Sequence, residues 1–271
     1  MKIFKFICIF FSTLLLMACE DVVEVDLEQS DPRLVVEASI IWENDTSGNN
    51  QIIRLTTTAP FFDSEIPPAT EAIVEIISET GTIYNFNEVD PGIYRNDNFN
   101  PQINARYTLN IEYKEELYTA TETLIPVVPL EEITQSKNGG FNSDEYELKG
   151  FYTDPQEEQN FYLVRFTFED LSIQIYDDEF TNGNRTFAYF SNEDLKIGDE
   201  VNFEIQGISE QFYNYLYILS SQAGTNNGGP FQTQPTTVRG NIVNITNPDN
   251  FAFGYFRLSQ SNDLSYKIQQ N

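Results

Sequence analysis

Hydrophobic and polar residues alternate with a period of two along most of the chain, which predicts a protein built mainly from β-strands. Leu34 to Ile40 and Gln51 to Thr58 are the first clear runs, and a polar stretch at residues 44–50 separates them. Further alternating runs continue to about residue 124, with turns such as Glu79-Thr80-Gly81 between them. Short strands at this spacing favour an immunoglobulin-like β-sandwich over residues 34–127.

The proline-flanked segment Ile125-Pro126-Val127-Val128-Pro129 interrupts the alternation and marks a predicted domain boundary. Residues 128–271 are again mostly strand-like, so we expect a second β-rich domain with one principal helix near residues 209–222. Ser209 can cap this helix. The side chains of Phe212, Leu216 and Leu219 share one face at helical spacing, which predicts that this face packs on a sheet.

The first nineteen residues have the pattern of an export leader. Lys2 and Lys5 precede an almost unbroken apolar run from Phe6 to Ala18. This run is shorter than the ~20 residues that a membrane-spanning helix needs. The run ends in Leu16-Met17-Ala18-Cys19, which resembles a bacterial lipobox and predicts cleavage before Cys19 and lipidation of its sulfur. The alternative is an ordinary signal peptide in which the cysteine occurs by chance.

Residue counts then exclude several kinds of chemistry. The 271 residues include no histidine, so a Ser-His-Asp triad and imidazole metal ligands are impossible. Cleavage would remove Cys8 and lipidation would block Cys19, which leaves no thiol for a disulfide or a nucleophile. The 42 acidic and 15 basic side chains give a formal charge of −27, which argues against binding to nucleic-acid phosphates.

Acidic residues follow the predicted lipidation site directly. Glu20 and Asp21 begin a segment, residues 20–33, that we interpret as an acidic tether. Acidic residues at this place resemble the signal that sends Bacteroidetes lipoproteins to the cell surface, so we expect an outer-membrane protein that faces outward. The alternatives are a merely solvated tether and a lipoprotein that faces the periplasm.

Candidate binding residues are few. Asp178 and Asn182 lie in an oxygen-rich, glycine-containing loop that could hold calcium, although a phenylalanine replaces one expected oxygen ligand and no glutamate follows at the twelfth position. We expect no other cofactor. Phe61, Phe62 and Phe231 are apolar side chains in loop-like segments, which makes them candidate partner-binding residues. Pairs of neighbouring acidic residues are interpreted as solvated surface.

The order of several short motifs resembles an uncharacterised family of Bacteroidetes outer-membrane lipoproteins, catalogued as domain of unknown function four-two-four-nine. After the lipobox and the tether, the motifs are Leu34-Val35-Val36-Glu37, Ala72-x-Val74, Gly92-x-Tyr94, Tyr107-x-Leu109-x-Ile111, Asp154-Pro155, Asn160-Phe161-Tyr162-Leu163, Phe180-Thr181-Asn182-Gly183, Gly240-Asn241-Ile242 and Gly254-Tyr255-Phe256. Asn104-Ala105-Arg106 departs from the family at a turn where a glycine is expected. The resemblance implies a location, an architecture and frequent association with TonB-dependent receptors, but no catalytic residues.

Three classes of function remain open. We expect a non-enzymatic accessory lipoprotein that partners a TonB-dependent outer-membrane transporter, which requires no catalytic residue. The first alternative is a free-standing module that binds a glycan or a peptide, or that mediates adhesion. A hydrolase with a carboxylate pair is the second alternative, and the absence of histidine, of a thiol and of a nucleophile-elbow motif counts against it.

Overall fold

The structure is a computed structural model, and it describes residues 31–60, 63, 65–139, 145–223 and 237–270. The leader, most of the tether and residues 61–62, 64, 140–144, 224–236 and 271 therefore lie outside the described residues. Six residues singled out above fall there: Cys19, Glu20, Asp21, Phe61, Phe62 and Phe231.

The predicted mostly-β class is confirmed. The described residues form one helix, α2 (Glu210–Ala223), and the following strands: β1 (Leu34–Glu43), β2 (Gln51–Thr57), β3 (Ile73–Ser78), β4 (Ile83–Asp90), β5 (Ile93–Asn96), β6 (Arg106–Tyr113), β7 (Glu116–Ile125), β8 (Glu132–Gly139), β9 (Glu145–Thr153), β10 (Phe161–Thr167), β11 (Leu171–Asp177), β12 (Arg185–Asn192), β13 (Glu200–Ile208), β14 (Val243–Asn244) and β15 (Phe253–Lys267). Buried and more exposed residues alternate along most of these strands, so every second side chain lies in a core, as the period of two predicts.

Eight strands surround the first hydrophobic core. They pair in the order β15, β1, β2, β5, β4, β3, β6, β7, and β15 then pairs with β7 through Leu258 and Leu124. This last pairing joins the two edges that an open sheet would leave unpaired. Fully buried side chains such as Ile40, Leu55 and Leu109 fill the space that the eight strands enclose.

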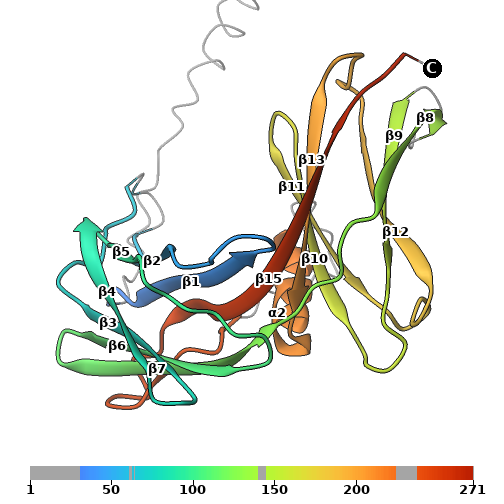
Figure 1. The fold of residues 1–271 in the computed structure, drawn as a ribbon. Helices are drawn as coiled ribbons and strands as arrows, with labels where there is room; N and C mark the ends of the chain where they lie inside the picture. Colours follow the sequence, from blue (N-terminus) through green and yellow to red (C-terminus); the bar gives the residue numbers. More distant parts are fainter. Residues whose placement is uncertain (1–30, 61–62, 64, 140–144, 224–236, 271) are drawn as a thin grey trace, which may run out of the picture. The chain divides into compact units, whose positions relative to one another are not determined.

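The strand β15 belongs to two cores, and Figure 1 shows it in red passing from beside β1 to beside β13. Its first nine residues, Phe253 to Ser261, run parallel to β1. From Ser261 onward it runs antiparallel to β13. There it joins the sheet β11, β10, β13, whose apolar residues share the second core with those of the three-stranded sheet β12, β9, β8.

The predicted boundary at residues 127–128 falls between β7 and β8, but the two cores are not consecutive segments of chain. Ile242, Ala252, Phe256 and Leu258 lie in sequence between Ile205 and Ile268 of the second core, yet they are buried in the first core. Residues Pro32–Asn271 accordingly form one compact unit. Residues 128–271 are therefore not a domain of their own, because they supply the strand β15, which closes the first core, together with the buried side chains of Ile242 and Ala252.

The helix begins where the sequence predicts. Ser209 Oγ accepts a hydrogen bond from the backbone N–H of Phe212 at 3.3 Å, which is the expected N-cap. Phe212 and Leu216 pack in a small third cluster with residues of β10, β13 and β15. The predicted packing of Leu219 is wrong: its side chain is 37% exposed, because this cluster covers only the first two turns of the helix.

Candidate functional site

The predicted calcium loop is tied to the segment at residues 158–160 by hydrogen bonds of its side chains. Asp178 is buried, and its carboxylate accepts a hydrogen bond from the backbone N–H of Asn160 at 2.8 Å. The side-chain amide of Asn182 donates to the carbonyl of Glu158 at 3.3 Å. Within the described ranges no three histidine, cysteine, aspartate or glutamate side chains are placed to hold a metal ion. These contacts assign Asp178 and Asn182 to loop closure and give no support to calcium binding.

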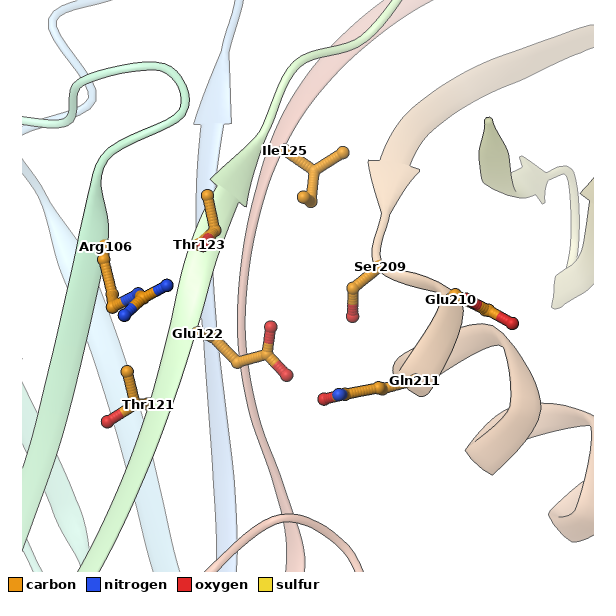
Figure 2. A pocket seen from close by; sticks show the side chains of 8 residues that line it. All are labelled: Arg106, Thr121, Glu122, Thr123, Ile125, Ser209, Glu210 and Gln211. Atoms are coloured by element: carbon orange, nitrogen blue, oxygen red, sulfur yellow. The ribbon is translucent and has the colours of Figure 1, made fainter. Parts of the chain in front are cut away.

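The structure instead brings the start of α2 against β7 and leaves a polar depression of about 400 Å³ between them, shown in Figure 2. We call it the Glu122 depression. Its volume is within the range of small-molecule sites. It is lined by Arg106, Thr121, Glu122, Thr123, Ile125, Ser209, Glu210 and Gln211.

Glu122 is the buried acid of this depression. Its Oε1 accepts hydrogen bonds from the hydroxyl of Tyr255 and from the side-chain amide of Asn241, both at 3.1 Å. Burial raises the pKa of Glu122, and hydrogen bonds from Tyr255, Asn241, the backbone of Thr123 and the side chain of Ser209 partly offset that rise. The carboxylate therefore connects β7, β15 and the first residue before the helix.

A second acid, Glu210, lines the same depression without facing the first. In Figure 2 the carboxylate of Glu122 points toward Gln211 and Ser209, whereas the carboxylate of Glu210 points away from it. Glycoside hydrolysis by a carboxylate pair requires two carboxyl groups that face each other across the scissile bond. These two side chains do not have that arrangement.

A second depression of about 380 Å³ adjoins the first and shares Gln211 with it. We call it the Arg239 depression. Gln211, Asn214, Tyr215 and Ile218 occur at positions i, i+3, i+4 and i+7 of α2, so one face of the helix forms one wall. The other lining residues are Val238, Arg239, Gly240, Asn241 and Tyr255. The rings of Tyr215 and Tyr255 lie 4.9 Å apart between their centroids.

Two guanidinium groups converge on one ring at the edge of this depression. The guanidinium carbons of Arg239 and Arg33 lie 3.6 Å and 3.9 Å from the ring centroid of Phe251, which is cation–π distance. Arg33 also donates to the carbonyl of Asp249 at 2.9 Å. Across the described residues, neither arginine forms an ion pair. Two positive charges therefore lie next to each other, one of them on a residue that lines the depression.

Sequence reasoning did not find these residues, although one signal was present. Tyr118, Ala120 and Leu124 are buried alternate residues of β7, and Glu122 occupies the same face. A glutamate on the core-facing side of a strand is unusual and marks a hydrogen-bonded or functional site. The contributions of α2 and of residues 238–241 depend on tertiary contacts that no local pattern indicates, such as the one between Glu122 and Asn241, 119 positions apart.

A model of the family described as Domain of unknown function (DUF4249) matches residues 20–265. The chain belongs to this family. Among curated proteins, none matches this DUF4249 chain. One similar solved structure is a two fibronectin type-III domain segment from chicken tenascin, with 15% identity over 67% of this chain and 89% of that one. Its TM-score of 0.21 is too low to support an argument about the fold.

The part of the DUF4249 chain that the structure describes contains no helix long and apolar enough to cross a membrane.

Proposed function

We propose that this DUF4249 protein is a lipid-anchored outer-membrane protein that faces the cell surface and acts as a non-enzymatic binding partner of a TonB-dependent transporter. The lipobox ending at Cys19, followed by Glu20 and Asp21, supports the anchor and the outward orientation. Without the leader the formal charge is about −29, so charge attraction would not hold the protein on an anionic membrane surface. The lipid supplies that attachment.

One observation carries the binding role: two adjoining depressions are lined by residues of α2, of three strands and of the segment at residues 238–241, and they contain a single inward-facing acid. Glu122 accepts hydrogen bonds from two neutral donors, and Glu210 points away. Such a site offers donors, acceptors and aromatic surface to a ligand, but no opposed pair of carboxyl groups. This arrangement supports capture of a small molecule or a chain segment in preference to hydrolysis.

The architecture is part of the same proposal. We interpret the first half, residues 34–127, as a variant of the immunoglobulin-like sandwich in which a strand from the end of the chain closes the sheet. The alternating burial of its strands and their mostly antiparallel pairing support this interpretation.

Anchoring is tested by replacing the lipidated cysteine in the full-length protein. Cys19→Ala should abolish palmitate labelling and release the protein from the outer-membrane fraction. Cys8→Ala is the matched control, because Cys8 lies inside the apolar run of the leader and is removed with it. Palmitate labelling of Cys19→Ala at the level of the unaltered protein would refute the anchor.

The partner is tested by a pull-down from detergent-solubilised outer membrane with the lipidated protein as bait. We expect a TonB-dependent receptor to co-purify. Recovery of a bound glycan or peptide without any receptor would favour the free-standing binding module. Turnover of such a ligand that is lost in Glu122→Gln, without recovery of a receptor, would favour the hydrolase.

A further inference from the structure

We propose that the Arg239 depression binds the C-terminal residue of a peptide, with the terminal carboxylate on Arg239 and an apolar side chain against Tyr215, Ile218 and Val238. This inference rests on the proposed function, because it names the class of ligand that the binding protein captures. It concerns a site that no feature of the sequence indicated.

The local charge favours an anion. No acidic residue lines the Arg239 depression, although the chain has 42 acidic and 15 basic side chains. Arg239 and Arg33 stack on Phe251, and no carboxylate within the described residues neutralises either of them. The Debye length is about 8 Å at physiological ionic strength, so the distant acidic surface is largely screened there. The near acid, Glu122, already accepts hydrogen bonds from the lining residues Asn241 and Tyr255, whereas Arg239 has no ion-pair partner among the described residues.

The remaining lining fits an apolar group beside that anion. Tyr215 and Tyr255 present rings, and Ile218 and Val238 present aliphatic surface. The side chain of Ile218 is 44% exposed, so apolar contact area is available there. Asn214 and Gln211 add side-chain amides that can donate to a carboxylate or pair with a peptide bond. A carboxylate joined to an apolar side chain is the chemistry of a peptide C-terminus.

The adjoining Glu122 depression favours a peptide over a small organic acid as the ligand. It shares Gln211 with the Arg239 depression and continues with polar and charged groups, among them Ser209 and Arg106. The backbone of the residues before the C-terminus needs such donors and acceptors, whereas a small acid would leave this depression unused. A tripeptide should therefore bind more tightly than a small acid of the same terminal chemistry.

The experiment measures binding of alanyl-alanyl-phenylalanine to the full-length lipidated protein in detergent by isothermal titration calorimetry. The same tripeptide with an amidated C-terminus and 3-phenylpropionate are the comparison ligands. We expect the free acid to bind about 10- to 100-fold more tightly than the amide, which is the usual effect of losing a hydrogen bond between charged groups. We expect 3-phenylpropionate to bind more weakly than the tripeptide acid.

Variants then locate the site. Arg239→Gln should reduce affinity for the acid to that for the amide, and Arg239→Lys should restore part of the preference. Ile218→Glu, at an exposed position of α2, should lower the affinity for the tripeptide acid, because it places a negative charge in the depression. Arg54→Gln is the matched control, because Arg54 is an exposed arginine on β2 that lines neither depression. It should leave the preference for acid over amide unchanged.

Equal binding of acid and amide, no binding of either, or an unchanged preference in Arg239→Gln would overturn the inference. Binding of 3-phenylpropionate as tight as that of the tripeptide would overturn its peptide part. Co-purification of a transporter is a separate measurement and should persist in Arg239→Gln. The proposed function can therefore stand if the peptide site fails, and it can fail while the peptide site stands.

Discussion

A side-chain truncation in the second core should destabilise the first core equally, because β15 is part of both. We choose Phe203→Ala on β13. Phe203 is fully buried and packs against Phe166 with a centroid distance of 4.8 Å. Its strand pairs with the second half of β15, whose first half pairs with β1. The destabilisation caused by lost packing on β13 should therefore reach the first core through β15, which is one continuous strand.

The expected magnitude follows from the burial of Phe203. Truncation of a fully buried phenylalanine to alanine typically costs about 3–5 kcal/mol, from lost apolar transfer and the cavity that remains. For a unit of this size, each kcal/mol lowers the melting temperature by about 2–4 °C, so the midpoint should fall by roughly 6–20 °C. Natural domains unfold at a cost of about 5–15 kcal/mol, so the variant should remain folded at room temperature but near its limit.

The chain provides a reporter in the first core. Trp42, its single tryptophan, lies on β1 and packs against that core. Guanidinium unfolding is followed by tryptophan fluorescence, which reports the first core, and by far-ultraviolet circular dichroism, which reports both. Phe203→Ala should shift the two transitions to the same lower midpoint, and Glu200→Ala, at an exposed position of the same strand, should shift neither.

A tryptophan transition that stays at its original midpoint in Phe203→Ala, while the circular dichroism transition splits or moves, would refute the coupling. The two cores would then be independent folding units despite the shared strand.

Two further perturbations address the buried acid and a close strand contact. The raised pKa of Glu122 means that the folded protein holds this proton more tightly than the unfolded chain, so stability falls as pH rises from the ordinary value of 4.5 through the folded pKa. In pH-dependent unfolding, Glu122→Gln should remove this slope relative to the unaltered protein and be at least as stable at neutral pH; an unchanged slope would contradict the assignment. Gly254 has φ +91°, and a Cβ there would lie 1.9 Å from the carbonyl oxygen of Val36, so Gly254→Ala should separate β15 from β1 and lower the melting temperature strongly. Gly81→Ala, at φ +86° with open space around it, should cost only the backbone strain of about 1–2 kcal/mol; equal losses in both variants would exclude a steric effect.

Local pattern was sufficient to predict most elements of secondary structure. The strands near residues 34–40, 51–58, 107–111 and 117–124 and the helix capped by Ser209 all occur, because alternation and capping are decided by near neighbours. The expected glycine at the turn before Tyr107 is replaced by a residue that suits it: Asn104 has φ +61°, and asparagine tolerates the left-handed conformation better than most residues.

Long-range pairing was not predictable from one sequence. The alternation in residues 128–271 predicts strands, but it gives no sign that one of them runs from Phe253 to Lys267 and serves two cores. The parallel register of Val36 with Gly254 joins residues 218 positions apart, and the alternating pattern of a strand is the same whichever strand it pairs with. The candidate site depends on this pairing, because Tyr255 and Asn241 reach Glu122 only once β15 lies beside β1 and β7.

Because β15 is the last strand of the described chain, its synthesis determines when folding of the first core can finish. The first core begins with Leu34 but is completed by Phe256 and Leu258, so a chain still emerging from a ribosome or a translocation channel lacks the strand that closes it. Pairings this distant in sequence form slowly. If the proposed export holds, this delay is favourable: the chain would stay extended during passage through the membrane and its fold would close after most of its length has crossed.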